Sequence, residues 1–397
     1  MSTWEEIAVP DALLDTSVGK QHQVLAQDIA PTGAYPVIDQ GQSFIAGYCD
    51  DPSRVIDFAL PVIIFGDHTR AFKYVDFPFV LGADGTKVLK PDPEQFDARY
   101  FYFAMLALDI PNRGYNRHFK ILRERSIPKP PLPEQQRIAQ VLSTVQEAIA
   151  QQERLIRTTT ELKQALMQKL FTEGLRGEAL KETEIGMVPE SWEVVKLEEF
   201  CQRPDGLIQT GPFGSQLHSH EYTSEGIPVV NPTHLSGNRI NHEDVPRVPK
   251  EVADRLGRHY VQLGDILFAR RGEIGRHGLV GKAEVGWLCG TGCFLVRAND
   301  PRLNNEYLSY FCSIKPVVDW LNSHAAGAIM PNLSTSVIAN LPVGLPPLDE
   351  QRQIFEAFNA LEQKLDQAEQ KRTKLQDLFR TLLHELMTGK VRVNELN

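Results

Sequence analysis

The chain has 397 residues, of which 42% are hydrophobic and 23% charged, an ordinary globular composition with enough length for two or three domains. No apolar run is long enough for a membrane span, and the N-terminal residues lack a signal-peptide pattern, so we expect a cytoplasmic protein without membrane contact. The five cysteines are scattered and predict neither a disulfide framework nor a zinc site. The net charge of −9 argues mildly against nucleic-acid binding, unless cations cluster locally.

The first block, residues 1–129, has the pattern of a mixed α/β domain. Short apolar runs at residues 35–38, 59–65 and 77–81 are separated by Gly and Asp turn signals and predict strands. Residues 96–108 contain no helix breaker and predict a helix.

Two polar segments of this block are candidates for recognition. Residues 66–70 (Gly-Asp-His-Thr-Arg) follow a predicted strand, and residues 113–125 carry five Arg or Lys against one Glu. An Asp next to a His can indicate acid–base chemistry or a metal site. No further ligand stands at metal spacing, so a hydrogen bond within a turn is favoured. We therefore assign recognition, not catalysis, to these residues, with the basic ones as candidate nucleic-acid contacts unless they only form a solvated surface: Gly66, Asp67, His68, Thr69, Arg70, Lys73, Arg113, Asn116, Arg117 and Lys120.

Residues 130–176 predict a long helix. Pro-Pro-Leu stands at its start, and Glu134 places negative charge at the positive end of the helix dipole. Apolar side chains then recur at alternating spacings of three and four, which is typical of a coiled-coil seam. The predicted seam residues are Ile138, Leu142, Val145, Ile149, Leu162, Leu166 and Leu170.

Residues 177–188 are polar and contain Gly, which predicts a linker. The second block, residues 189–345, repeats the pattern of the first more than its sequence. Residues 227–230 (Ile-Pro-Val-Val) match residues 35–38 (Tyr-Pro-Val-Ile), and residues 265–269 fall where residues 62–66 do. Two related domains that differ in their loops would read two different targets.

The second block has its own candidate residues, in a Gly-rich loop after residue 209 and in a basic stretch, residues 255–282, with six Arg or Lys against two acidic residues. The loop matches neither a Walker motif nor a dinucleotide fingerprint. Its backbone could hold a single phosphate, or its glycines could simply serve a tight turn, and the charges alone also fit a solvated surface. The predicted DNA-binding residues are Thr210, Gly211, Ser215, Gln216, Arg270, Arg271, Arg276 and Lys282.

Residues 346–392 repeat residues 130–176 without gaps, and internal repetition of this kind indicates a tandem architecture. The two helices should bury their seams against each other in antiparallel fashion around a pseudo-twofold axis, although each could instead pair with a second copy of the chain. The second seam comprises Ile354, Phe358, Leu361, Leu365, Leu375, Leu382 and Leu386.

Several motifs together resemble the specificity subunit of type I restriction-modification enzymes. They are TGPFGSQLHSHEY, IPVVNPTHL, GDILFARRGEIGR, GWLCGTGCFLVRA and MPNLSTSVIANLPVGLPPLDEQRQI, with IPKPPLPEQQRI and FGDHTRAFKYVDFPFVLGADGTKVL in the first half. The resemblance covers nearly the whole chain. It implies a mixed α/β fold with target-recognition domains at residues 1–129 and 189–345, spacer helices at residues 130–176 and 346–392, and a linker at residues 177–188.

The resemblance also implies the partners. Each recognition domain would read half of a split, asymmetric sequence in double-stranded DNA, while the spacer helices hold the domains apart and dock two modification subunits. Those partners would methylate adenine with S-adenosylmethionine, and restriction subunits would use ATP and Mg²⁺ to translocate and cleave DNA. We expect no cofactor, metal or catalytic residue on this chain. A coiled-coil scaffold and a stand-alone DNA-modifying enzyme are the alternative interpretations.

Overall fold

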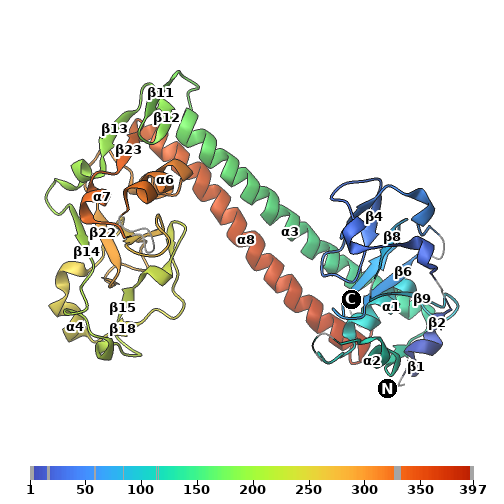
Figure 1. Cartoon of the computed structure of the whole chain (residues 1–397). Coiled ribbons are helices and arrows are strands. Elements are labelled where there is room, and N and C mark those ends of the chain that lie inside the picture. The colour runs from blue at the N-terminus through green and yellow to red at the C-terminus, as the bar shows by residue number, and fades with distance from the viewer. Residues whose placement is uncertain are drawn as a thin grey trace. The chain divides into compact units, whose positions relative to one another are not determined.

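The computed structural model describes residues 4–15, 18–57, 60–83, 85–112, 114, 116–325 and 332–393 (Figure 1). The chain divides into two compact units. Unit 1 comprises Met1–Leu155 and Ala368–Asn397, and unit 2 comprises Ile156–Gln367. Each unit combines β-sheets with helices, as predicted for a mixed α/β protein.

Unit 1 contains two four-stranded sheets and a short strand pair. The antiparallel sheet has the order β2 (Leu13–Leu14), β9 (Thr86–Pro91), β6 (Val62–Gly66), β7 (Phe72–Val75). The second sheet has the order β3 (Gln23–Val24), β8 (Val80–Gly82), β4 (Tyr35–Ile38), β5 (Gly47–Cys49), and β8 runs parallel to both its neighbours. The remaining elements are β1 (Glu5–Ala8) paired with β10 (Ser126–Lys129), α1 (Ala98–Ala107) and α2 (Phe119–Arg123).

Unit 2 is built on the same plan. Its antiparallel sheet has the order β14 (Leu207–Thr210), β22 (Cys293–Arg297), β19 (Ile266–Ala269), β20 (His277–Leu279). A second sheet has the order β18 (Arg247–Val248), β15 (Ile227–Val230), β21 (Leu288–Cys289), with β15 and β21 parallel. The other elements are β13 (Glu193–Lys196) paired with β23 (Pro342–Leu345), β16 (Leu235–Ser236) paired with β17 (Arg239–Ile240), α4 (Lys250–Arg255), α5 (Asn305–Cys312), α6 (Lys315–His324) and α7 (Thr335–Ala339).

The correspondence of the strands confirms the tandem repeat. Strand β19 takes the place of β6 between its two antiparallel neighbours, and β15 takes the place of β4 beside a parallel partner. The same segments match in sequence, residues 265–269 with residues 62–66 and residues 227–230 with residues 35–38. In each half one strand of the two-stranded pair, β10 or β23, immediately precedes a long helix.

The long helices are α3 (Leu132–Glu173) and α8 (Leu348–Met387). In unit 1, Ile138 and Leu142 near the start of α3 lie in one core with Leu386 at the end of α8. In unit 2, Phe171 at the end of α3 stacks on Phe358 near the start of α8, with ring centroids 5.7 Å apart. In each unit the start of one helix meets the end of the other, so the helices pair antiparallel as predicted (Figure 1).

Most predicted seam residues lie in the helix pair, but Leu162 is an exception. It is 49% exposed, because Thr159 and Lys163 take the inward positions and Lys163 Nζ forms an ion pair with Glu362 of α8 at 2.5 Å. The buried seam residues are Ile138, Leu142, Ile354, Phe358 and Leu386. The half-buried ones are Val145, Ile149, Leu166, Leu170, Leu361, Leu365, Leu375 and Leu382.

The segment whose composition predicted a linker forms a hairpin, β11 (Leu180–Thr183) and β12 (Gly186–Pro189). Ile185 and Val188 are buried in the core of unit 2. These two apolar side chains anchor an otherwise polar segment, which a composition average does not reveal. None of the helices within the described residues is long and apolar enough to cross a membrane.

Candidate nucleic-acid interface

In unit 2, three loops meet at one end of the antiparallel sheet. Because neighbouring strands alternate in direction, the end of β14 and the end of β19 lie beside the start of β22, in the register Thr210 to Phe294 and Ala269 to Cys293. Loop residues 211–217, 270–276 and 290–292 therefore come together, and we call this set the unit 2 loop edge. Arg270 N donates to Gly292 O at 2.8 Å and fixes two of the loops together.

Gly211 in the Gly-rich loop is required by packing. A Cβ at this position would stand 2.0 Å from Gly290 O, so no other residue fits without moving backbone. Gly211 N already donates to Cys293 O at 2.8 Å. Its amide is thus occupied, which favours the tight-turn interpretation over phosphate binding at this residue.

The cation with the most accessible position on this edge is Arg271. Its side chain is exposed, and no carboxylate among the described residues pairs with it. The neighbouring Arg270 is half-buried: its Nε donates to Asn332 Oδ1 at 3.2 Å, and its guanidinium lies 5.8 Å from the centre of the Phe213 ring. Phe213 is itself 53% exposed.

The other predicted residues of unit 2 differ in availability. Arg276 pairs with Glu273, and Gln216 Oε1 accepts from Phe213 N at 3.1 Å, so both side chains have partners inside the loops. Ser215 is exposed on the same edge, and Thr210 ends β14 there. Lys282 lies three residues after the end of β20, where Leu279 pairs with Ile266 at the start of β19. The structure therefore places Lys282 at the opposite end of the sheet from Arg271.

Unit 1 brings its two polar segments together at the equivalent end of its sheet. The turn after β6 is joined to the start of β9, because Asp67 N donates to Gly85 O at 2.7 Å. The carboxylate of Asp67 accepts from Phe119 N at 2.7 Å, and its carbonyl accepts from His118 N at 2.9 Å. Asp67 thus ties the loop at residues 67–71 to the basic segment before α2, and we call this set the unit 1 loop edge.

Most of the polar atoms of the turn at residues 66–71 serve its own conformation. Gln40 holds it from the side, because its Oε1 accepts from His68 N at 3.2 Å and its carbonyl accepts from the Thr69 hydroxyl. Arg70 adopts a φ of 62°, in the left-handed region, and its Nη1 donates to Ile110 O at 2.9 Å. Gly66 ends β6 beneath this turn and is buried.

Lys73 lies inside unit 1 instead of on its surface. The side chain is buried, and its Nζ donates to the carbonyls of Asp39 at 2.8 Å and Ser43 at 2.5 Å. Burial lowers the pKa of Lys73, although the nearby carboxylate of Asp39 partly offsets this effect. With its donors engaged, Lys73 supports the loops and does not present a charge to solvent.

Arg117 and Lys120 are the exposed cations of the unit 1 loop edge, and neither has an ion pair with any acidic residue that the structure describes. Asn116 is exposed beside them. Arg113 lies outside the described residues. The predicted set of unit 1 therefore divides into accessible residues at 116, 117 and 120 and supporting residues such as Asp67 and Lys73.

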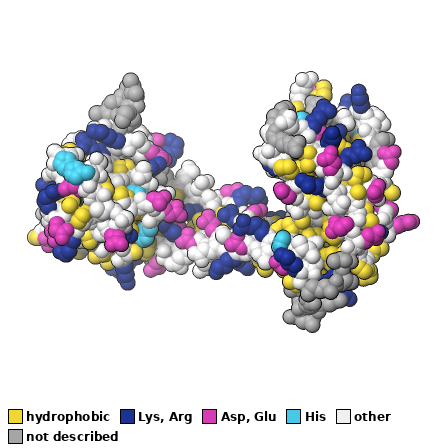
Figure 2. Space-filling view, turned by 90° about the horizontal axis from the view of Figure 1, so that it is seen from below, with side chains coloured by type: hydrophobic (Ala, Val, Ile, Leu, Met, Phe, Trp, Pro, Cys, Tyr) yellow, Lys and Arg dark blue, Asp and Glu magenta, His cyan; other side chains and the backbone are white. Residues whose placement is uncertain are grey.

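Figure 2 shows Lys and Arg side chains interspersed with Asp and Glu over the face that it presents. Phe213 is not among the predicted residues, although a large apolar side chain between two glycines in a loop is a signal for it. Within the described residues, no three His, Cys, Asp or Glu side chains gather as a metal ion would require.

Comparison with known proteins follows this division of the chain. The family model for the type I restriction modification DNA specificity domain matches residues 19–158 and again residues 189–377. The specificity subunit of the type I restriction enzyme MjaVIII of Methanocaldococcus jannaschii is 27% identical over 289 residues, which span 70% of this chain and 65% of that protein. The putative MjaX specificity subunit of the same organism is 28% identical over 68% of this chain and 60% of its own length.

The fold has a solved counterpart. The crystal structure of the type I restriction-modification system S subunit from M. genitalium has a TM-score of 0.63 and 20% sequence identity, and the match covers 97% of this chain and 96% of that one. At this identity the likeness concerns the fold. The two matches to the specificity-domain model cover most of the chain, and the protein belongs to the family of type I restriction-modification DNA specificity subunits.

Proposed function

We propose that this chain reads a bipartite, asymmetric sequence in double-stranded DNA through its two loop edges, one half-site for each unit. It carries no catalysis of its own in this proposal. Two modification subunits supply S-adenosylmethionine-dependent adenine methylation, and restriction subunits supply ATP- and Mg²⁺-dependent translocation and cleavage. This assignment makes it a protein of the cytoplasm, where the DNA is.

One observation carries the proposal. The two units share a strand plan, and in both units most of the predicted polar residues lie at the same end of the antiparallel sheet, with Lys282 as an exception. The loops there differ in sequence, and each exposes a cation that forms no ion pair with a described carboxylate, Arg271 in unit 2 and Arg117 in unit 1. A common scaffold with divergent, cationic loops suits the recognition of two different DNA half-sites, because loops on a rigid sheet can change specificity without changing the fold.

The choice between base and phosphate contacts depends on the side chain. Arg271 can donate two hydrogen bonds to one guanine in the major groove, whereas Lys120 acts as a point charge and suits a phosphate. Phe213, exposed beside Arg270, offers an apolar surface of the kind that contacts a thymine methyl group or an unstacked base step. Firm contacts on both sides of the target adenine would support base flipping by the modification subunit.

The test is selection of bound sequences from a library of random DNA duplexes by the chain assembled with its modification subunits. We expect enrichment of two short sequence elements separated by a gap of fixed length and free sequence. The same selection with the modification subunits alone is the control and should enrich neither element. Enrichment of a single uninterrupted sequence, or of the same elements without this chain, would contradict the proposal.

A further inference from the structure

The globular body of unit 2, from β13 to β23 (residues 193–345), is held to the long helices at two places. The first is a buried aromatic cluster. The ring centroids of Tyr307 on α5 and Phe171 on α3 are 5.5 Å apart, and those of Tyr310 on α5 and Phe358 on α8 are 5.2 Å apart. A single apolar patch fixes where the body lies on the helices, but it restricts rotation about the patch much less.

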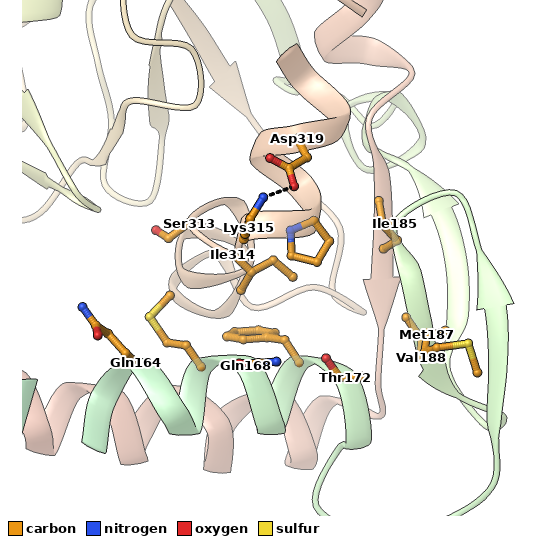
Figure 3. Close-up of a pocket in the computed structure, with 13 residues that line it drawn as sticks. Gln164, Gln168, Thr172, Ile185, Met187, Val188, Ser313, Ile314, Lys315 and Asp319 are labelled. Atoms are coloured by element: carbon orange, nitrogen blue, oxygen red, sulfur yellow. Dashed lines mark hydrogen bonds and ion pairs between the residues drawn. The ribbon is translucent and has the colours of Figure 1, made fainter. Parts of the chain in front are cut away.

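Packing beside this cluster is open. A cavity of ≈ 660 Å³ separates α3 from the start of α6 (Figure 3). Gln164, Gln168 and Thr172 of α3 line one side of it. On the other side Lys315 pairs with Asp319 at 2.5 Å, within α6 itself, so this charge makes no link to α3. Close packing therefore does not restrain the body along this side of α3.

The second attachment is Arg239, at the start of β17. Its Nε and Nη2 donate to one carboxylate oxygen of Glu362 at 3.2 Å and 2.9 Å, and its Nη1 donates to the two oxygens of Asp366 at 3.1 Å and 2.8 Å. Glu362 also pairs with Lys163 of α3 at 2.5 Å. A guanidinium can serve two carboxylates because its donors are arranged in a planar fork. Arg239 thus joins the body to α8 directly and to α3 through Glu362.

The backbone around Arg239 is firmly attached to the antiparallel sheet. Leu235 and Ile240 of the β16–β17 hairpin lie in one core with residues of β19 and β22. A Cβ at Gly278 would stand 2.9 Å from Arg239 O, so the hairpin rests directly on the backbone of β20. Strand β20 begins where residues 270–276 of the unit 2 loop edge end. Arg239 therefore connects the loop edge to the long helices through rigid elements.

The two attachments are separated along α8. Glu362 follows Phe358 by four residues and Asp366 follows it by eight, which places them about 6 Å and 12 Å farther along the helix at 1.5 Å per residue. A body held at two separate points of a helix cannot tilt along the helix axis as it could about one point. The link through Arg239 thus restricts the motion that the aromatic cluster leaves open.

Unit 1 has neutral residues at the equivalent helix positions. Gln146 Nε2 donates to the Tyr102 hydroxyl at 3.4 Å, and the rings of Phe379 and Phe103 lie 6.0 Å apart. The fold therefore does not require an ionic link here, and the charges of unit 2 serve a purpose beyond folding. In the gapless match of residues 130–176 with residues 346–392, the corresponding pairs are Gln146 with Glu362, Ala150 with Asp366 and Lys163 with Phe379.

We propose that Arg239 is a positioning residue that fixes the tilt of the unit 2 body on the long helices and so gives the gap between the two DNA half-sites a single length. The inference rests on the proposed function, which supplies the half-sites. Arg239 makes no DNA contact in this proposal, because two carboxylates occupy its guanidinium and would repel a phosphate. Without the link the body can tilt, and gaps that differ by one base pair, about 3.4 Å, become accessible.

The experiment selects bound sequences from random DNA duplexes with the chain assembled with its modification subunits. The wild type should enrich one gap length. With Arg239→Ala, the preference for that gap over gaps one base pair longer or shorter should fall by a factor of about three to ten, while both sequence elements stay unchanged. Lys163 still pairs with Glu362 in this variant, so the buried carboxylate keeps a partner. Arg239→Lys keeps the charge and should restore part of the preference.

Arg302→Ala is the matched control. The Arg302 side chain is 50% exposed, against 51% for Arg239, and it also pairs with a buried carboxylate, that of Asp300, but both partners belong to the body. This variant should keep the single gap. Asp366→Asn should broaden the gap in the same direction as Arg239→Ala, and the double variant should be no broader than Arg239→Ala alone.

The outcomes separate the positioning role from the proposed function. An unchanged single gap with Arg239→Ala, an altered sequence element for unit 2, or equal broadening by Arg302→Ala would overturn the positioning role. A wild type that enriches no gapped sequence would contradict the proposed function instead, and a measurement without DNA then decides whether Arg239 fixes the tilt.

That measurement is the distance between spin labels on the full chain. Leu263→Cys labels the body and Gln363→Cys labels α8, because both side chains are exposed, and Cys49→Ser with Cys201→Ser removes the two half-buried thiols. Double electron–electron resonance should give one narrow distance distribution, which Arg239→Ala should broaden. An equally narrow distribution in that variant would show that Arg239 does not fix the tilt.

Discussion

Gln135 and Gln351 make equivalent hydrogen bonds in the two units. Each follows Pro-Pro-Leu at the start of a long helix, and each is fully buried. Gln135 Oε1 accepts from Asp97 N, and Gln351 Oε1 accepts from Asn304 N, both at 2.8 Å. Each side-chain amide also donates to two carbonyls, those of Gln95 and Pro130 in unit 1 and of Arg302 and Pro346 in unit 2. Asp97 and Asn304 are the N-caps of α1 and α5, so each glutamine joins the start of a long helix to a short helix of its unit.

Replacement of Gln351 should therefore loosen unit 2 at the start of α5. Gln351→Ala leaves the Asn304 amide and two carbonyls without partners in a buried site, which costs about 1–3 kcal/mol for each unsatisfied group. Hydrogen exchange followed by mass spectrometry should show faster exchange around residues 304–307. Gln353→Ala, an exposed residue on the same helix, is the control and should leave exchange unchanged.

Glu362 should make the stability of unit 2 depend on pH. It accepts from Arg239 Nη2 at 2.9 Å as well as pairing with Lys163. Burial would raise the pKa of Glu362, but the hydrogen bond from Lys163 and the charges of Lys163 and Arg239 outweigh this and hold the pKa below its usual range. A depressed pKa stabilises the folded state above the usual glutamate range, and the contribution is lost as pH falls through roughly 4 and below.

Glu362→Gln tests this account. The variant should unfold more easily than the wild type at pH 7, by about 1–3 kcal/mol, because it loses charge-assisted hydrogen bonds. Thermal unfolding measured at pH 7 and at pH 3.5 should show the difference shrinking at the lower pH. A difference that is the same at both values would mean that ionisation of Glu362 does not stabilise unit 2.

Replacement of Arg271 tests DNA binding by the unit 2 loop edge, and replacement of Lys282 is the matched control. Both are exposed cations of unit 2, but they stand at opposite ends of its antiparallel sheet. Arg271→Ala should weaken binding of the assembled complex. A lost phosphate contact would reduce the log-log salt slope by about one, and a lost base contact would instead relax one half-site by about 1–3 kcal/mol. Lys282→Ala should change neither quantity, and equal effects of the two variants would argue against the unit 2 loop edge.

Asp67 should act by positioning other residues, since a carboxylate repels phosphate. Asp67→Ala removes the acceptor for Phe119 N and should displace Arg117 and Lys120, with a loss of DNA affinity of about tenfold. Asp67→Asn keeps an oxygen acceptor and should restore most of the affinity. Titration of both variants at several salt concentrations measures this. If Asn behaves like Ala, the ionised carboxylate itself is needed and the positioning role is wrong.

The sequence predicted the architecture well because its main signals are periodic. Long helices, a repeat of 216 residues and strand-like runs survive local variation, so α3, α8 and the matching strands β6 and β19 were found. The inward turn of Thr159 and the exposure of Leu162 were not predicted, because the ion pair between Lys163 and Glu362 depends on the facing helix.

The charge pattern selected segments that the structure brings together at the two loop edges, and their role in DNA binding stays a prediction. Whether a cation faces solvent depends on tertiary partners far away in sequence. The Lys73 ammonium donates to the backbone carbonyls of Asp39 and Ser43, and Lys282 lies at the end of the sheet opposite to the unit 2 loop edge. The hydrogen bond from Phe119 N to the Asp67 carboxylate joins residues 52 positions apart, so no local sequence pattern predicts it.

Methylome sequencing of cells that produce this chain with its modification subunits tests most directly whether each unit recognises its own DNA half-site. We expect adenine methylation within one asymmetric, gapped motif. The variant Arg117→Ala should alter or relax the half-site read by unit 1 and leave the other half-site and the gap unchanged, whereas Arg271→Ala should do the reverse. A motif that is continuous, that persists without this chain, or whose two halves both change with either variant would contradict the claim that each unit reads its own half-site.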